Sequence, residues 1–213
     1  MNLSGRAAKW LLALALAAAA AQAIAQPQPG REFNRLDPPR PVSTGSRIEV
    51  IEFFYYGCPV CYETEPLLSR WLAAAPDDIA IRRVPALSSE SWAPFARLFY
   101  TLDALGQIDR LHWPIYENFQ LDDVKLNDEK IMLDWVARNG VDREKFAGAY
   151  RSPEVAARVD HARELIRAYD VSGVQTFVVD GKFTTSARLA GGTKQVIQVL
   201  DDLVKLARQE RRR

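Results

Sequence analysis

The sequence predicts an α/β fold that is interrupted by a block of helices. A run rich in β-branched and aromatic residues, 48–56, and an alternating run, 79–84, flank a segment whose apolar residues recur at helical spacing. Residues 87–170 then show helical periodicity, and strand-like residues return at 176–179 before a final helical pattern. Because the last strands and helix complete the sheet that the first half begins, we expect the helical block to be an insertion within an α/β domain.

The first 25 residues have the composition of a secretory signal. Arg6 and Lys9 supply the positive start, residues 10–21 form an apolar stretch, and Ala23 and Ala25 give a small-residue cleavage pattern. A membrane anchor is the alternative, but this stretch is short for a bilayer span and much of it is alanine. We therefore expect export, with cleavage after Ala25.

Removal of this segment leaves 188 residues with 26 basic and 27 acidic side chains, so the net charge changes from +1 to −1. Such a balance argues against nucleic acid or an anionic membrane as the main partner. Residues 26–46, rich in Pro and Gly, predict a loose N-terminal arm in which residues 33–36 could add a short edge strand. The expected α/β domain then comprises residues 47–86 and 171–213, with residues 87–170 as the inserted helical domain.

Both cysteines lie where the first strand meets the following helix. Gly57 breaks the strand, and Pro59 occupies a helix-start position that tolerates a missing N–H. Cys58 therefore falls at the first turn, where unsatisfied N–H groups and the helix dipole favour a thiolate. Cys61 lies one turn further on, close enough to form a disulfide with Cys58. The layout predicts a redox pair in which one sulfur attacks and the other resolves.

Other interpretations of the pair are weaker. A zinc site lacks ligands, because the chain has no further cysteine and its two histidines, His112 and His161, are distant in the sequence. A structural disulfide would close a tiny loop and stabilise little. Haem attachment requires a histidine after the second cysteine, where Tyr62 stands. Two inert buried thiols would leave the strand–Gly–Cys–Pro context unexplained. We expect neither a metal nor a cofactor.

The remaining helices follow from periodicity and capping residues. Pro66 lies inside the cysteine helix and should kink it. Within the helical block, three apolar stripes predict helices: Trp92, Phe95, Phe99 and Leu102; Ile131, Trp135 and Val136; Val155, Val159, Ala162, Ile166 and Tyr169. Asn127 or Asp128 should cap the second of these helices. His161 lies off the last stripe and is expected at the surface, whereas His112 has no readable partner.

The C-terminal part predicts a hairpin and a helix. Asp180 and Gly181 form a strong two-residue turn signal between residues 176–179 and 182–184. The last helix should run from about residue 194 to 209, with an inward apolar face made by Val196, Leu200, Leu203 and Val204. Residues 208–213 are expected to form a frayed, solvated tail.

Two segments resemble the DsbA family of thioredoxin-fold periplasmic thiol–disulfide oxidoreductases: Glu52–Tyr62, EFFYYGCPVCY, and Ser172–Phe183, SGVQTFVVDGKF. The order of elements, including the helical insertion, agrees over essentially the whole mature chain. The resemblance implies a thioredoxin fold, with Cys58 as the exposed nucleophile and Cys61 as its buried partner. It also implies that Glu52 is a buried acid that helps to move protons at Cys61; the sequence alone leaves open an acid on an exposed strand edge.

The resemblance further implies a periplasmic enzyme that acts on reduced or misoxidised exported proteins through a mixed disulfide at Cys58. A membrane disulfide oxidase of the DsbB type would then reoxidise the pair. Separately, we expect a monomer. A second class stays open: a protein on the same fold that binds thiols, a metal or unfolded chains without turnover.

Two positions depart from the family pattern. The usual Pro-His between the cysteines is here Pro59-Val60, and because valine cannot stabilise a thiolate as histidine does, we expect a weaker oxidant. The usual Val-Pro of the cis-proline loop is here Val174-Gln175, followed by Thr176. A cis bond before a non-proline residue costs about 2.5–4 kcal/mol. We therefore expect a trans or mixed Val174–Gln175 bond, a reshaped substrate groove and slower disulfide transfer.

Overall fold

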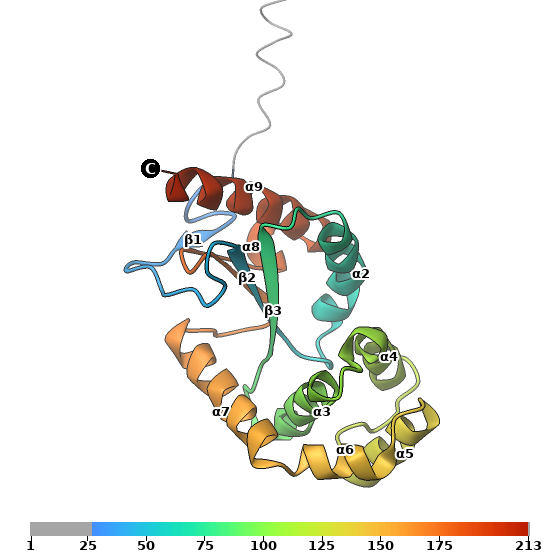
Figure 1. The fold of residues 1–213 in the computed structure, drawn as a ribbon. Coiled ribbons are helices and arrows are strands. Elements are labelled where there is room, and N and C mark those ends of the chain that lie inside the picture. Colours follow the sequence, from blue (N-terminus) through green and yellow to red (C-terminus); the bar gives the residue numbers. More distant parts are fainter. Residues whose placement is uncertain (1–26, 213) are drawn as a thin grey trace, which may run out of the picture.

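The computed structural model describes residues 27–212, which form a five-stranded sheet with helices on both faces (Figure 1). The sheet has the order β1-β5-β4-β2-β3. The strands are β1 (Asn34–Arg35), β2 (Ile48–Phe54), β3 (Ile79–Pro85), β4 (Thr176–Val179) and β5 (Phe183–Thr185). β2 runs parallel to β3 and antiparallel to β4, so it lies at the centre of the sheet and all seven of its residues are buried.

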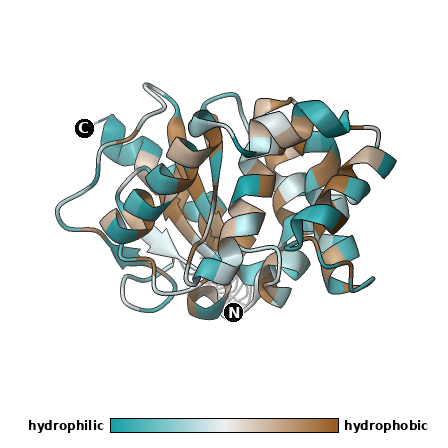
Figure 2. Cartoon of the chain, turned by 90° about the horizontal axis from the view of Figure 1, so that it is seen from below, coloured by the Kyte–Doolittle hydropathy of each residue, from teal (hydrophilic) through white to brown (hydrophobic). Residues whose placement is uncertain are grey.

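The two faces of the sheet pack against different helices. Alternate residues of a strand point to opposite faces. Ile48 and Val50 accordingly join a core with α2 (Pro59–Ala73), α8 (Ala187–Ala190) and α9 (Thr193–Arg211), whereas Ile51 and Phe53 join the core of the helical block. Figure 2 shows the central strands mostly in the hydrophobic colour, between helices in which hydrophilic and hydrophobic residues alternate.

The helical block lies between β3 and β4 in the sequence. It contains η1 (Glu90–Trp92), α3 (Ala93–Ala104), α4 (Ile108–Gln120), α5 (Glu129–Arg138), α6 (Arg143–Tyr150) and α7 (Pro153–Ala168). α3 contacts α4, α6 and α7, and so forms the centre of this lobe. The predicted helix cap at Asp128 is confirmed, because its side chain accepts a hydrogen bond from the N–H of Ile131. The predicted α/β architecture with inserted helices is thus confirmed.

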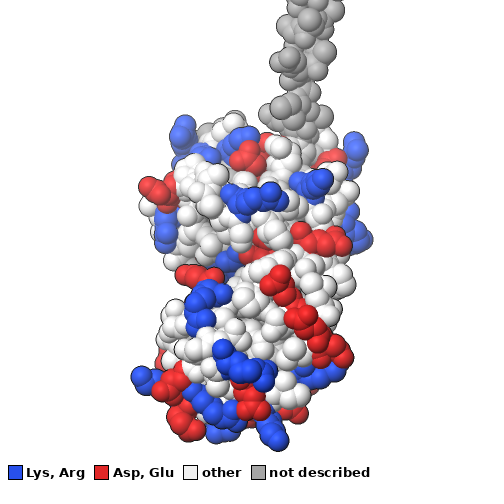
Figure 3. All heavy atoms as spheres, turned by 90° about the vertical axis from the view of Figure 1, so that its right-hand side faces the viewer, with Lys and Arg blue, Asp and Glu red and all other residues white. Residues whose placement is uncertain are grey.

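The space-filling view shows the α/β lobe above the helical lobe (Figure 3). Acidic and basic side chains are interspersed over both lobes on this face, in keeping with the near-zero net charge of the sequence. Among residues 27–212, no helix combines the length and the apolar character that crossing a membrane requires. The predicted signal segment, residues 1–25, lies outside the described residues.

The N-terminal arm is not loose in the part that the structure describes. β1 pairs with β5, which confirms the predicted edge strand. Phe33 is buried and packs edge-on against Phe183, with ring centroids 5.6 Å apart. Buried aromatic contact and strand pairing therefore fix a segment whose Pro and Gly content had predicted mobility.

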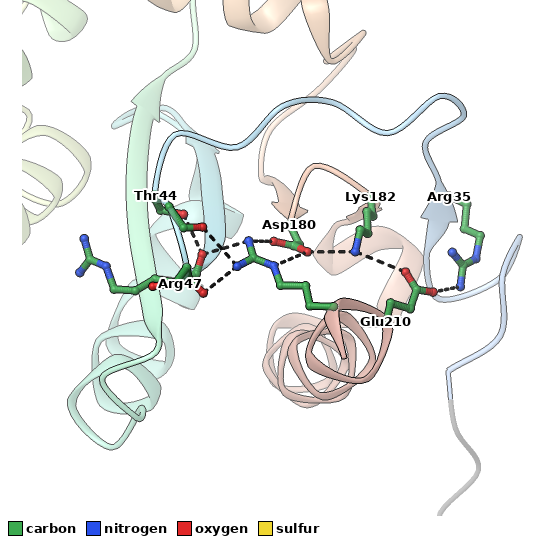
Figure 4. Close-up of polar contacts among 9 residues, drawn as sticks. Arg35, Thr44, Arg47, Asp180, Lys182 and Glu210 are labelled. Carbon is green, nitrogen blue, oxygen red and sulfur yellow. Dashed lines mark hydrogen bonds and ion pairs between the residues drawn. The ribbon is translucent and has the colours of Figure 1, made fainter. Parts of the chain in front are cut away.

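Residues 208–212 are also ordered, contrary to the expectation of a frayed tail. α9 continues to Arg211, whose guanidinium donates to the buried Asp180 and to the backbone carbonyls of Ser46 and Arg47, at 2.6 and 3.1 Å (Figure 4). Arg208 pairs with Asp78, and neighbouring ion pairs continue the cluster: Lys182–Asp180, Lys182–Glu210 and Arg35–Glu210. The expectation failed because the partners lie far away in the sequence.

Candidate active site

Cys58 caps the helix that leaves the central strand. Its backbone is extended, with φ −90° and ψ 115°, and Pro59 is the first helical residue. The Cys58 sulfur accepts a hydrogen bond from the N–H of Cys61 at 3.2 Å. Cys58 is therefore the N-cap residue of α2, a position that serine or aspartate usually occupies, and its sulfur lies near the unpaired N–H groups of the first turn. The predicted position of Cys58 is confirmed.

The two thiols differ in exposure and acidity. Both are free and buried in this structure: Cys61 is 0% exposed and Cys58 only 8%, so the expectation of an exposed Cys58 is wrong. A hydrogen bond from the Cys61 thiol, assisted by backbone N–H groups, lowers the pKa of Cys58 to about 7 against the opposing effect of burial. Burial, together with the hydrogen bond to Cys58, raises the pKa of Cys61 well above its ordinary value. At neutral pH, Cys58 is therefore the better nucleophile and the better leaving group.

Glu52 lies buried in β2, with no exposed side-chain surface, so the alternative of an acid on an exposed edge is wrong. Burial, and after it the charge of Glu65, raises the pKa of Glu52 to about 7, although Arg83 and Gln175 oppose this. Arg83 lies between the two carboxylates, with 3.3 Å from its Nε to Glu52 Oε2 and 2.9 Å from its Nη2 to Glu65 Oε1. A buried carboxyl group that titrates near neutral pH can exchange a proton with a neighbouring thiol.

His112 extends this buried polar cluster, which the sequence did not predict. Burial lowers the pKa of His112 and raises that of Tyr56, and the Tyr56 hydroxyl shares a hydrogen bond with Nδ1 of a neutral His112 at 2.8 Å. The other ring nitrogen, Nε2, lies 3.5 Å from Glu65 Oε2. One sequence signal could have found Glu65: this charged residue lies on the buried face of α2, at helical spacing from Cys61 and Leu68.

A cleft of about 690 Å³ reaches the far side of this cluster from solvent. Its walls come from α2, β3, α3 and α4, and they include the side chains of Glu65, Arg83 and His112. The cluster therefore lies between the cysteine pair on one side and an open cleft on the other.

A second cleft, of about 970 Å³, lies beside the cysteine pair and contains the residues that were expected to form the substrate groove. Val60, which is 37% exposed, lies on one wall. Val174, Gln175 and Thr176 lie on another, where the Thr176 hydroxyl donates to the Gly173 carbonyl at 2.7 Å.

The Val174–Gln175 peptide bond is cis, so the expectation of a trans or mixed bond is wrong. The contacts of the side chain account for the position that Gln175 takes. It is 3% exposed, and its Nε2 donates to Glu52 Oε1 at 2.5 Å. Gln175 therefore points into the protein toward the buried acid, a pairing that no local sequence pattern predicted.

The helical block contributes one residue directly to the cysteine loop. Gln120, at the end of α4, donates from Nε2 to the backbone carbonyls of Tyr56 and Cys58, at 2.7 and 3.1 Å. These two bonds tie the loop before α2 to the inserted helices. Nothing in the local sequence pattern of Gln120 marked it for this contact, because the partners lie in another part of the fold.

The arrangement defines a dithiol–disulfide exchange site. An acidic, helix-capping thiol lies beside a buried thiol of high pKa, with a titratable acid beneath them and an open cleft alongside. In the part of the chain that the structure describes, no three His, Cys, Asp or Glu side chains gather so that they could hold a metal ion. The chemistry that this site can perform is the exchange of disulfides between Cys58–Cys61 and another dithiol.

Comparisons with known proteins agree with this chemistry. Residues 78–203 match the model of the DSBA-like thioredoxin domain family. The thiol:disulfide interchange protein DsbA of Azotobacter vinelandii is 37% identical over 179 residues, which cover 84% of each chain. The DsbA of Pseudomonas aeruginosa is 36% identical over 179 residues, covering 84% of this chain and 85% of the relative.

Solved structures show the same fold. A crystal structure of Pseudomonas aeruginosa DsbA superposes with a TM-score of 0.83 at 35% identity, covering 86% of this chain and 96% of that one. Reduced DsbA1 from Neisseria meningitidis gives a TM-score of 0.78 at 27% identity, covering 88% and 98%. The chain therefore belongs to the DsbA family of thiol:disulfide oxidoreductases, and the expected thioredoxin fold with an inserted helical domain is confirmed.

Proposed function

We propose that this protein introduces or exchanges disulfides in exported proteins, and that Cys58 is the sulfur that contacts them. The observation that carries the proposal is the contrast between the two thiols. The pKa of Cys58 is lowered to about 7 at the helix start, while Cys61 lies fully buried behind it with a raised pKa. Relatives named thiol:disulfide interchange protein support it.

In the oxidising direction, a substrate thiolate attacks the Cys58 sulfur of the Cys58–Cys61 disulfide. The bond between the two cysteines breaks, a mixed disulfide forms at Cys58, and Cys61 leaves as a thiolate. A second substrate thiolate then attacks the substrate sulfur of the mixed disulfide and releases Cys58 as a thiolate. The substrate loses two electrons and gains a disulfide, and the cysteine pair is reduced. A thiol with a low pKa is a good leaving group, which favours this last step.

Glu52 serves in this scheme as the proton donor and acceptor for Cys61. Because Cys61 is buried, its thiolate is unfavourable and takes up a proton as it forms. Glu52 titrates at about pH 7, so near neutral pH it can supply that proton and recover it when the pair is reoxidised.

The cleft beside Cys58 is the proposed substrate groove. An extended substrate segment would lie along Val174, Gln175 and Thr176, with Val60 as an apolar contact on the opposite wall. Pro59 fixes the start of α2, and with it the direction in which Cys58 faces the groove.

The division of the chain that we propose follows from this scheme. Residues 47–86 and 171–213 carry the cysteines, Glu52 and the groove. Residues 87–170 support the cysteine loop through Gln120 and complete the buried cluster through His112.

Location and partners are inferred from the signal composition of residues 1–25 and from the family. We place the mature protein in the periplasm as a monomer, acting on reduced or misoxidised exported proteins. A membrane disulfide oxidase of the DsbB type would reoxidise the Cys58–Cys61 pair.

Disulfide transfer to a reduced, unfolded ribonuclease tests the proposal, since ribonuclease activity returns as its disulfides form. The oxidised protein should restore activity while free thiols appear at Cys58 and Cys61 in equal amounts. Cys58→Ser should abolish transfer. Cys61→Ser, first loaded with glutathione as a mixed disulfide at Cys58, should release glutathione to a ribonuclease thiolate and accumulate a mixed disulfide between Cys58 and ribonuclease. If the Cys58–Cys61 disulfide forms but no transfer occurs, the protein is a binding protein on this fold and the proposal is wrong.

A further inference from the structure

Gln175 joins the proposed groove to the buried acid. It belongs to the wall of the 970 Å³ cleft, yet its side chain is almost fully buried and reaches Glu52. Its Nε2 donates to Glu52 Oε1 at 2.5 Å, whereas the other carboxylate oxygen, Oε2, forms an ion pair with Arg83 Nε at 3.3 Å without a hydrogen bond. Glu52 Oε1 therefore has Gln175 as its hydrogen-bond partner.

The other polar atom of the Gln175 amide is its oxygen, Oε1. Within residues 27–212, Gln175 Oε1 is buried and has no hydrogen-bond partner. A buried acceptor without a partner is unfavourable and calls for an explanation. If Gln175 only filled space here, an apolar side chain of the same size would stabilise the folded protein equally well.

The protonation state of Glu52 supplies the explanation. A carboxylate only accepts hydrogen bonds, whereas a protonated carboxyl group also donates one through its O–H. A primary amide carries an N–H donor and a C=O acceptor of nearly equal size, and rotation by about 180° about its last side-chain bond exchanges them. Gln175 can thus donate to the carboxylate through Nε2, or accept from the protonated acid through Oε1.

Several other charged or titratable groups face Glu52 from the surrounding elements, and they bear on its protonation: Arg83 of β3, Glu65 and Cys61 of α2, Tyr56 of the cysteine loop, and Tyr116 of α4. Arg83 stays protonated near neutral pH and acts only as a donor. The Tyr56 hydroxyl pairs with His112, and the Tyr116 hydroxyl has no hydrogen-bond partner among the described residues. Gln175 is the one of these groups that hydrogen-bonds to Glu52, and its amide can present either a donor or an acceptor without changing charge.

We propose that Gln175 is a positioning residue that pairs with Glu52 in both of its protonation states, its amide turning over when the proton moves between Cys61 and Glu52. The proposal rests on the proton-transfer role given to Glu52 above. When the Cys61 thiolate takes the proton from Glu52, the carboxyl O–H bond breaks and the thiol S–H bond forms. The amide then changes from accepting through Oε1 to donating through Nε2. Proline, the residue that the family pattern carries here, offers neither a side-chain donor nor an acceptor.

Nuclear magnetic resonance of the reduced wild-type protein, labelled with ¹³C and ¹⁵N in glutamine and glutamate, tests the turnover directly. Between pH 5 and 9, the Glu52 carboxyl carbon should titrate with a midpoint near 7. Above that midpoint the Gln175 side-chain N–H signals should lie downfield; below it they should move back while the side-chain carbonyl carbon of Gln175 moves downfield. If the N–H signals stay downfield throughout and the carbonyl carbon does not move, the amide does not turn over and the proposal is wrong.

Gln175→Met gives an independent test, with Gln198→Met as the same change at an exposed position of α9. We expect Gln175→Met to slow the reduction of the disulfide by a dithiol about fivefold at both pH 6 and pH 8, the size expected for one lost hydrogen bond. Gln198→Met should leave the rate unchanged. Slowing at pH 8 alone would indicate a donor only and would overturn the proposal. The two proposals fail separately. If the protein transfers no disulfide to ribonuclease but Gln175 and Glu52 still titrate together, the proposed function is wrong and the turnover of the amide stands.

Discussion

Replacing Glu52 by glutamine should change the way in which stability depends on pH. The folded protein raises the pKa of Glu52 from 4.5 to about 7, chiefly through burial. Between these values the folded state binds more protons at this site than the unfolded state does. The contribution of Glu52 to stability is therefore fully present below about pH 4.5 and is lost as the pH rises through about 7. Glu52→Gln has no ionisable group at this site and should lack this loss.

The size of the effect follows from the shift. Each pKa unit corresponds to about 1.36 kcal/mol, so a shift of roughly 2.5 units sets an upper limit of about 3 kcal/mol. Most of that range falls between pH 5 and 8. Over this interval, the free energy of unfolding of Glu52→Gln should rise by about 2–3 kcal/mol relative to the wild type. Arg83 retains its pairing with Glu65 in the variant, so the charge that remains in the cluster is not isolated.

Guanidinium unfolding followed by tryptophan fluorescence, at pH 5, 6.5 and 8 with reductant present, measures this difference. Glu144→Gln, at an exposed position of α6, serves as the matched control and should follow the wild type at all three pH values. If wild type and Glu52→Gln differ by the same free energy at pH 5 and at pH 8, then Glu52 does not titrate near neutral pH, and the proton role assigned to it fails.

Three further substitutions test the surroundings of the site. Val60→His places a hydrogen-bond donor beside Cys58 at an exposed position. The pKa of Cys58 should therefore fall by about one unit, and the reduction potential of the Cys58–Cys61 pair should become more oxidising by about 30 mV. No change in either value would show that the start of α2 alone sets the acidity of Cys58. Gln120→Met removes two hydrogen bonds to the cysteine loop and should lower the free energy of unfolding by about 1–2 kcal/mol, and an unchanged denaturation midpoint would argue against this support. Arg211→Ala leaves the buried carboxylate of Asp180 without its guanidinium partner and should lower the free energy of unfolding by about 2 kcal/mol. Arg208→Ala should lower it less, because its partner Asp78 is exposed. A larger loss for Arg208→Ala would contradict this account.

Local patterns were enough to predict the framework of the fold. The β-branched run that became β2 and the Gly-Cys-Pro junction that starts α2 each follow from neighbouring residues. Asp180 and Gly181 both take positive φ, as the predicted hairpin turn requires. Because each of these signals spans only a few neighbouring residues, the elements could be predicted without knowledge of the tertiary structure.

The buried cluster could not be predicted in the same way, because its members come from different elements. Glu65 pairs with Arg83 across the α2–β3 connection, and His112 arrives from the inserted helices. Gln175 reaches Glu52 through a contact between residues more than a hundred positions apart. The prediction of a frayed tail failed for the same reason, since Arg211 is held by a carboxylate in the β4–β5 turn.

The rate of alkylation of the two thiols as a function of pH tests the central claim most directly. Reduced protein is treated briefly with iodoacetamide between pH 5 and 10, and the label is located by peptide mapping. Cys58 should react first, with a midpoint near pH 7, while Cys61 stays unlabelled over the same time. Preferential labelling of Cys61, or a Cys58 midpoint near 9, would contradict the assignment of Cys58 as the attacking and accepting sulfur.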